Sequence, residues 1–366
     1  MLLFLICLLA IHEVDALAPA ARPLAALHSS ASSGEKRPNL ARTASAAALV
    51  AGTTVGGGFL GLPAVVKPAG FVPTVITLTA SWLFLLAEAL VVAEAVSRCR
   101  GQASLSTVAE TAGASKILVR GLFFALVTAT LASQLSKAGT LLPALSYRAA
   151  TLAAAAAACV AALGPSTKRA ADLNAVLTAV FAASAVGVGV TATTSIKAGG
   201  LAFDASRLAI TNAAAARRSI PTILQLLVFA ETVPTVNELL GGDPPRIRAA
   251  LTFGSLAPLV LEGAWACLGL GLVTRGDPFE HLLGSDPTRI CSILLAGAAV
   301  ATTALGSILA LKSDAPTASR PRRAALYATL PSVAVALTSP EVFFKAMDFA
   351  GAYPVAILWG VFPPLA

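Results

Sequence analysis

The sequence predicts an all-α polytopic membrane protein with about ten transmembrane helices in a five-plus-five inverted repeat, with helices 1 and 6 broken. Composition is the first reason: hydrophobic residues make up 57% of the 366 residues, charged residues only 12%, and the mean hydropathy is +0.81. A water-soluble domain normally carries about twice that share of charged residues. The second reason is that two apolar runs, five spans apart, contain residues that break helices, a pattern typical of inverted-repeat membrane proteins.

The segment before the membrane domain reads as a targeting sequence. Residues 1–16 have the form of a signal peptide, with an apolar core from Leu2 to Ile11 and a small residue at Ala16. Residues 17–42 are rich in alanine, serine and arginine and contain one acid, Glu35, which is typical of a disordered transit peptide. Together the two segments resemble the bipartite presequences of algae with complex plastids. A plain secretory signal followed by a disordered linker is the alternative.

The membrane domain, residues 43–366, begins with an apolar run to about residue 66 that is long enough to cross a bilayer. Five glycines lie between positions 52 and 63 of this run, and each costs about 1 kcal/mol in a helix interior. Loosened backbone at membrane depth is tolerated only where it is buried in protein or lines a cavity. The run therefore predicts a broken helix whose backbone and hydroxyl groups meet a polar ligand; close helix packing is the alternative. The candidate ligand-binding residues are Thr53, Thr54, Gly56, Gly57 and Gly58.

Nine further apolar spans complete the two repeats, which cover about residues 43–195 and 219–366. They are expected at about residues 71–96, 117–142, 146–163, 172–194, 219–240, 249–273, 289–311, 324–337 and 347–362. The connection between the two repeats, residues 195–218, has room for an interfacial helix.

The sixth span is interrupted in its middle by the sequence Phe229-Ala230-Glu231-Thr232-Val233-Pro234. The proline removes one backbone hydrogen bond, and the glutamate places an ionisable group at membrane depth. Both features predict a second broken helix, so Phe229, Ala230, Glu231 and Thr232 are further candidates for a binding site.

Several classes of function are disfavoured by what the sequence contains. The net charge of +8 is spread over short connections without interleaved aromatic residues, so nucleic acid is not an expected partner. The three histidines and five cysteines form no metal-binding or catalytic pattern, so we expect no metal site, no cofactor and no enzymatic activity. A phosphate-binding loop of the GxxxxGK[ST] type is also missing, which argues against ATP-driven transport.

Three sequence blocks carry a resemblance to a known family. The first runs from Gly52 through Pro63, the second from Ile220 to Leu272 with Val228–Pro234 and Trp265, and the third from Pro340 through Tyr353. In this order they resemble the tryptophan/tyrosine permease branch of the hydroxy- and aromatic-amino-acid permease family, in particular its plastid members, within the amino acid/polyamine/organocation superfamily.

The resemblance implies a five-plus-five inverted-repeat secondary transporter that moves an aromatic amino acid together with a proton. Its partners would be the amino acid, the coupling proton and the lipid bilayer, and its location the inner envelope of a complex plastid, with an endomembrane or the plasma membrane as alternatives. Two departures are visible: Ala230 stands where the family usually has a histidine, and the sequence ends after the tenth span, where members usually have an eleventh. They leave open a non-transporting or sensor-like relative, or a carrier of another neutral amino acid.

The two predicted breaks suggest how an amino acid would bind. Its carboxylate would dock on backbone amides around Gly56–Gly58, because the N-terminus of a half-helix carries a partial positive charge. Its ammonium group would meet carbonyl oxygens at the two breaks, with Phe229 and Glu231 close by. Glu231 is the first candidate for proton coupling, since an acid at membrane depth is suited to proton exchange, and its alternative is a structural role within the break. Glu94, at a position that is usually acidic in the family, is the second candidate.

Overall fold

The computed structural model describes residues 39–98, 115–141, 144–163, 167–314 and 321–361. The expected signal peptide and most of the transit-like segment lie outside these residues. Within the described ranges the chain is helical, and extended structure is confined to one isolated antiparallel bridge between Phe203 and Leu272. The prediction of an all-α protein is therefore confirmed.

The chain divides into two compact units, and each unit takes helices from both halves of the sequence. The first, which we call the broken-helix unit, consists of Lys36–Leu126, Gly199–His281 and Met347–Ala366. The second, the continuous-helix unit, contains Val127–Ala198 and Leu282–Ala346. Four pairs of corresponding predicted spans fall in the same unit: the first, second, sixth and seventh in one, and the third, fourth, eighth and ninth largely in the other. The fifth pair is divided, because the fifth span lies in the continuous-helix unit and the tenth in the broken-helix unit.

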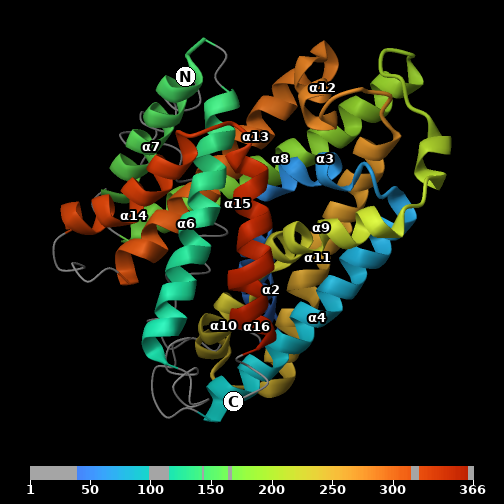
Figure 1. Ribbon diagram of the computed structural model, residues 1–366. Helices are drawn as coiled ribbons and strands as arrows, with labels where there is room; N and C mark the ends of the chain where they lie inside the picture. Colours follow the sequence, from blue (N-terminus) through green and yellow to red (C-terminus); the bar gives the residue numbers. More distant parts are fainter. Residues whose placement is uncertain (1–38, 99–114, 142–143, 164–166, 315–320, 362–366) are drawn as a thin grey trace. The chain divides into compact units, whose positions relative to one another are not determined.

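In the broken-helix unit, α11 packs along α2, α3 and α4, and α4 packs against α9 (Figure 1). The elements of this unit are α2 (Asn39–Thr54), the 3-10 helix η2 (Gly57–Gly61), α3 (Leu62–Val66), α4 (Phe71–Arg98), η3 (Ala205–Ala209), α9 (Ala213–Leu227), η4 (Ala230–Thr232), α10 (Val233–Leu240) and α11 (Pro244–Gly271). The tenth predicted span is divided into α15 (Val342–Ala350), a π-helical turn η5 (Gly351–Val355) and α16 (Ala356–Gly360), and it enters this unit at Met347.

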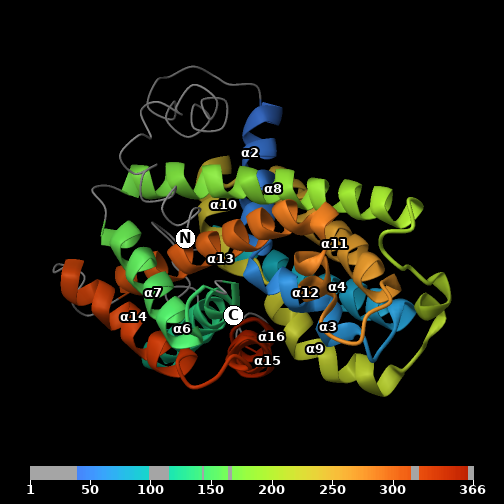
Figure 2. The same cartoon turned by 90° about the horizontal axis from the view of Figure 1, so that it is seen from above.

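In the continuous-helix unit, α13 lies along α8, and α14 packs against α7 and α13 (Figure 2). Its elements are α6 (Lys116–Leu141) from Val127 onward, α7 (Tyr147–Leu163), α8 (Thr167–Lys197), α13 (Asp286–Asp314) and α14 (Pro321–Ala336), and the short helix α12 (Pro278–Gly284) precedes α13.

Hydroxyl groups join the helices of the continuous-helix unit. The Tyr147 hydroxyl lies 2.6 Å from the carbonyl oxygen of Ala336 and 2.8 Å from that of Ser339, and it also contacts the Ser136 hydroxyl at 3.0 Å. These bonds connect the start of α7 to α6 and to the end of α14, which positions three helices without a charged group.

Helix starts in the second half differ from the predicted ones because of caps. The sixth span begins at Ala213 rather than at about 219, since the Asn212 side chain accepts a bond from the amide of Ala215 at 3.1 Å. The seventh begins at Pro244 rather than at about 249, where Asp243 caps the helix and proline occupies the first turn. Both cap types are standard helix starts that hydropathy alone does not register.

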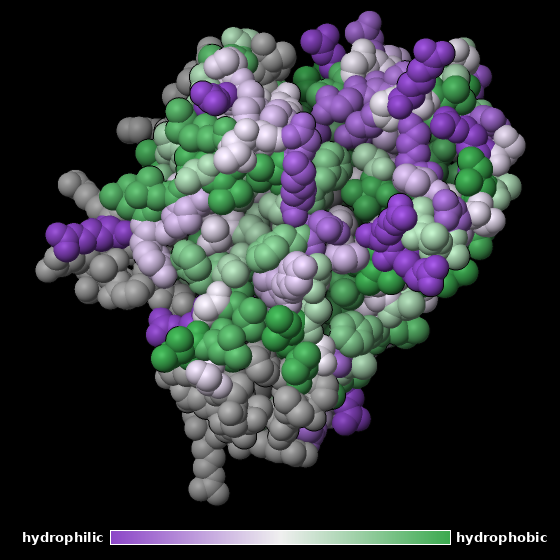
Figure 3. Space-filling view, in the orientation of Figure 1, coloured by the Kyte–Doolittle hydropathy of each residue, from purple (hydrophilic) through white to green (hydrophobic). Residues whose placement is uncertain are grey.

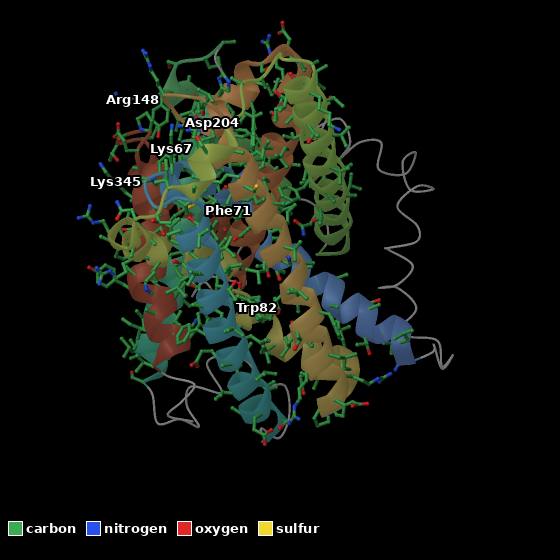
Figure 4. All side chains as sticks on the ribbon, turned by 90° about the vertical axis from the view of Figure 1, so that its right-hand side faces the viewer. Lys67, Phe71, Trp82, Arg148, Asp204 and Lys345 are labelled. Atoms are coloured by element: carbon green, nitrogen blue, oxygen red, sulfur yellow. The ribbon has the colours of Figure 1, made fainter. Side chains whose placement is uncertain are left out.

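The connection between α8 and α9 contains a 3-10 helix of five residues instead of the expected interfacial helix. Backbone bonds attach it to the end of α11: the Asp204 amide donates to Gly271 and the Val273 amide to Ala202, both at 2.9 Å. Hydrogen bonds from the Ser206 side chain and amide lower the pKa of Asp204, which lies at the same end of the unit as Lys67 (Figure 4). On the face drawn in Figure 3, polar side chains gather at the upper right, where Figure 1 places this connection.

Among the described residues, seven helices are long and apolar enough to cross a membrane, or eight if the bent pair formed by α2 with η2 and α3 counts as one span. Helices also occupy the fourth and ninth predicted spans, but α7 and α14 have only 17 and 16 residues. A multi-pass membrane protein is confirmed, while the count of ten spans and the inverted repeat stay predictions.

Candidate functional site

The candidate site rests on two helix breaks that have the same construction. In each, a helix stops, two residues without helical structure follow, and a 3-10 turn leads into a second helix with proline in its first turn. The two residues are Val55 and Gly56 in the first break and Val228 and Phe229 in the second. Equivalent bonds close the two turns, from the Phe59 amide to Gly56 at 3.1 Å and from the Thr232 amide to Phe229 at 2.9 Å. Both predicted interruptions are present among the described residues, but only the first bends the chain sharply, by 49°, whereas Ala213–Leu240 still forms one span of 28 residues.

The two breaks contact each other inside the broken-helix unit. The turn η4 of the second break packs on α2, and the turn η2 of the first break packs on α9. Gly58 permits this approach, because a Cβ atom there would lie 2.4 Å from Cδ2 of Leu226 and 3.1 Å from Sδ of Met347. At Gly58, the structure thus supports the packing interpretation that the sequence left open beside the binding one.

The two threonines of the first break already use their hydroxyl protons. The Thr53 hydroxyl lies 3.0 Å from the carbonyl oxygens of Leu49 and Val50, and the Thr54 hydroxyl donates to Val50 at 2.8 Å. Thr53 is exposed and Thr54 buried. A hydroxyl that donates to the preceding turn keeps its oxygen as an acceptor, so this geometry suits an ammonium group better than a carboxylate.

The second break buries three of its four candidate residues. Phe229 has no exposed surface, and Ala230 and Thr232 are also buried. The Phe229 carbonyl oxygen accepts two bonds from Thr232, one from the amide at 2.9 Å and one from the hydroxyl at 2.8 Å. This carbonyl therefore stabilises the turn itself, and the carbonyls at the end of α9 are the ones that the helix leaves without an internal donor.

The two predicted coupling acids lie in contrasting places. Glu231 is half-buried in the turn of the second break, and its Oε2 atom is buried without a hydrogen-bond partner. Glu94 is exposed on α4, one turn before the end of that helix. The structure places Glu231, and not Glu94, in the break.

A third acid in the same unit was not selected from the sequence. Glu262 of α11 is 1% exposed, and its Oε2 atom is buried without a hydrogen-bond partner. The signal that points to it is helical spacing: Glu262 shares a face of α11 with Gly254, Trp265 and Gly269, and all three approach the first broken helix.

Chemically, a pair of adjacent breaks offers charge of both signs without charged side chains. The half-helices that begin at the breaks direct amide groups and a partial positive charge toward them, and the half-helices that end there direct carbonyl oxygens and a partial negative charge. A zwitterion with a carboxylate and an ammonium group a few ångströms apart matches this arrangement.

Comparison with protein families matches residues 41–311 to the tryptophan/tyrosine permease family. The chain belongs to the tryptophan/tyrosine permease family. The match includes both breaks, the acid-bearing turn η4 and all of α11. Permeases are membrane transporters and not enzymes, which agrees with the helical, multi-pass structure. Comparison with curated proteins finds no match.

The matched region starts at the first residues of α2 and ends within α13. The candidate site of this permease, which is formed by α2, η2, α9, η4 and α11, therefore lies inside the matched region. The third sequence block noted above, Pro340 through Tyr353, lies beyond it.

Proposed function

We propose that this permease is a secondary active transporter that moves an aromatic amino acid, tyrosine or tryptophan, across an organelle membrane together with a proton. The observation that carries the proposal is the pair of adjacent helix breaks in one unit of a tryptophan/tyrosine permease family member. The choice of an aromatic substrate follows the family, and the plastid inner envelope follows the presequence.

The amino acid would lie between the two breaks. Its carboxylate would meet the first amides of the turn that begins at Gly57, with Gly56 and Gly58 beside it. Its ammonium group would meet the carbonyl ends of α2 and α9 and the oxygen of Thr54, whose proton is donated to Val50. Phe229 and Ala230 are buried, so in this proposal they form a wall of the site that stays fixed to η4.

Glu231 would carry the coupling proton in this scheme. Its buried Oε2 atom lacks a hydrogen-bond partner, and an acid in such a position can change protonation when the site opens to either side. Glu94, exposed on α4, would act in gating, away from the substrate.

We further propose the five-plus-five inverted repeat as the architecture. If the first and sixth spans are equivalent, and the second and seventh likewise, the packing of α2 on α11 should have a counterpart in the packing of α9 and α10 on α4. Both pairs of contacts are present in the broken-helix unit. The two breaks of equal construction also support equivalence of the first and sixth spans.

The test is uptake of labelled tyrosine, tryptophan and phenylalanine into proteoliposomes that contain the full chain, with and without an imposed pH gradient. We expect uptake of one of them to be driven by the gradient. Gly57→Leu should abolish this uptake, because Gly57 is buried in the turn, while Gly263→Ala on α11, where a Cβ atom would meet nothing within 4 Å, should retain it. Folded protein that takes up none of the three would favour another substrate or a non-transporting relative.

A further inference from the structure

Glu262 is buried more deeply than any other acid among the described residues, and no part of the proposed scheme uses it. It lies on α11 with 1% of its surface exposed, and its Oε2 atom has no hydrogen-bond partner. A buried carboxyl group without a partner is costly, so its surroundings decide what it can bind.

The contacts of α11 with the first broken helix place Glu262 at the level of the break. A Cβ atom on Gly254 would lie 2.6 Å from the carbonyl oxygen of Ala47, and one on Gly269 would lie 2.3 Å from Cβ of Pro63. Between them, the rings of Trp265 and Phe59 stack with centroids 4.9 Å apart. The broken helix and α11 therefore run in the same direction with a nearly constant offset, which sets Glu262 level with Val55 and Gly56.

Glu262 also points toward this side of α11. At 100° per residue, Gly254, Glu262, Trp265 and Gly269 fall within an arc of about 80°. Ser255, which accepts a hydrogen bond from Nε1 of Trp82 on α4 at 2.9 Å, marks the edge of the α4 contact close by. The Glu262 carboxyl group thus enters the angle between α4 and the break of the first helix.

The break presents the negative end of a helix at this level. The helix α2 stops at Thr54, and its last carbonyl oxygens lack donors within the helix. They carry a partial negative charge, and an ionised Glu262 would add a full negative charge beside them in a water-poor interior. The position therefore favours a positive charge or a proton on Glu262.

Charged groups on the elements packed against α11 lie away from this level. Lys67 follows α3 and donates to the carbonyls of Thr274 and Gly276, beyond the end of α11. The helix α4 begins at Phe71, near the end of α11, and Trp82 lies further along it beside Ser255, so α4 runs opposite to α11 (Figure 4). Glu88 follows Trp82 on α4, while Glu262 follows Ser255 on α11, so the two acids lie about 20 Å apart along the helix axis. The remaining charged residues of the described parts of these elements are Arg42 on α2, Glu94 and Arg98 on α4, Arg207 on η3, Arg217 and Arg218 on α9, and Glu238 on α10. The helix α12 also contacts α11, with ring centroids of Phe279 and Trp265 6.3 Å apart, and it carries the exposed Glu280 and the half-buried His281. Glu231 on η4, which packs on α2, is a further acid at the breaks.

The charged residues on α2, α4, η3, α9 and α10 do not lie at the same height along the helix axis as Glu262. Arg42 lies more than a dozen residues before the break, and Glu94 and Arg98 lie beyond Glu88 on α4. Arg207 donates to the carbonyl of Leu272, past the end of α11. The start of α9 is held near Ala69 by the Asn212 amide, so Arg217 and Arg218 are level with the last turn of α11. Glu238 is exposed.

We propose that Glu262 is a second proton-binding acid of this permease, which takes up a proton beside the break of the first helix and releases it during the transport cycle. The inference rests on the proposed proton-coupled transport for its role in the cycle. The binding of a proton by Glu262 itself can be measured without transport.

Trp265 provides that measurement, because it lies one turn from Glu262 on the same face of α11. In the full chain with Trp82→Phe and Trp359→Phe, the fluorescence of Trp265 is followed between pH 4 and pH 10. We expect a titration that disappears in Glu262→Gln, persists with a shifted midpoint in Glu262→Asp, and persists unchanged in the matched control Glu88→Gln. A titration that survives Glu262→Gln in folded protein would overturn the proposal.

Transport gives the second readout. One coupled proton and a gradient of one pH unit support about tenfold accumulation of substrate. We expect Glu262→Gln to retain exchange of labelled for unlabelled substrate and to lose this accumulation, while Glu88→Gln keeps both. Accumulation that persists in Glu262→Gln, or that follows a sodium gradient at equal pH, would exclude Glu262 as a coupling group. Absence of uptake by the wild-type chain would instead contradict the proposed function and leave the fluorescence titration to decide on proton binding.

Discussion

The two units of this permease solve the same problem, packing helices in a membrane, by different means. In the continuous-helix unit, helices run without interruption, and hydroxyl groups such as that of Tyr147 join them through backbone carbonyls. In the broken-helix unit, two helices are interrupted, and Gly254 and Gly351 bring backbone directly against other backbone. The close glycine contacts of the continuous-helix unit, at Gly139 and Gly187, are with side chains. Hydrogen bonding in the continuous-helix unit is not complete, since Thr128 Oγ1, Gln134 Oε1, Ser195 Oγ and Ser292 Oγ are buried without a partner.

The two units also differ in their buried acids. The broken-helix unit contains Glu88, Glu231 and Glu262, each with a buried carboxylate oxygen that lacks a hydrogen-bond partner. Among the described residues of the continuous-helix unit, no acid is buried. Acids at membrane depth are costly and suited to proton exchange, so we look for the proposed coupling group in the broken-helix unit, at Glu231 and Glu262 beside the breaks rather than at Glu88 further along α4.

The largest expected effect is on the backbone contact at Gly351 in the broken-helix unit. A Cβ atom there would lie 1.7 Å from the carbonyl oxygen of Pro221, so Gly351→Ala must separate the tenth span from α9. We expect a loss of about 3 kcal/mol in the free energy of unfolding, measured by thermal unfolding in detergent.

Gly263→Ala is the control for this variant, because its Cβ atom would meet nothing within 4 Å. Its effect should stay within about 0.5 kcal/mol. If both variants unfolded alike, close backbone contact would not be what holds the broken-helix unit together.

A smaller effect on stability, with a clear effect on uptake, is expected at Gly58. Its Cβ atom would lie 2.4 Å from Cδ2 of Leu226, which is the flexible end of a side chain. Gly58→Ala should therefore cost about 1–2 kcal/mol and lower the rate of uptake by separating the two breaks. Adding Leu226→Ala makes room for the new methyl group, so a double-mutant cycle should give a favourable coupling of about 1 kcal/mol. Strictly additive effects would contradict the contact between the breaks.

The smallest effect is expected in the continuous-helix unit. Tyr147→Phe removes a hydroxyl that bonds to the carbonyls of Ala336 and Ser339 and should cost about 1 kcal/mol of stability without changing the substrate affinity or the pH dependence of uptake. Tyr353→Phe, at an exposed position, is the control. A change in pH dependence with Tyr147→Phe would show that this unit takes part in coupling after all.

Local chemistry explains which parts of the structure could be predicted. Both breaks were expected because glycine and proline disrupt helices wherever they stand, and the apolar spans were expected because a bilayer demands them. The starts of α9 and α11 were placed five or six residues too late, since Asn212 and Asp243 act as caps in polar sequence that hydropathy excludes from a span. The 3-10 turn after α8 depends on backbone bonds to α11, which no local pattern announces.

The sequence by itself determined that this protein is a helical membrane permease with two interrupted helices, because composition, glycine and proline act within a few residues of where they occur. Only the tertiary structure decided where the acids lie relative to the two breaks. Glu88, Glu94 and Glu262 look alike as single acids in apolar runs, yet Glu94 is exposed, Glu88 lies about 20 Å along the helix axis from the level of the first break, and Glu262 is buried at that level. That distinction depends on the register between helices some 200 residues apart in the chain. Close contacts of Gly254, Trp265 and Gly269 fix this register, and they exist only once the helices have packed.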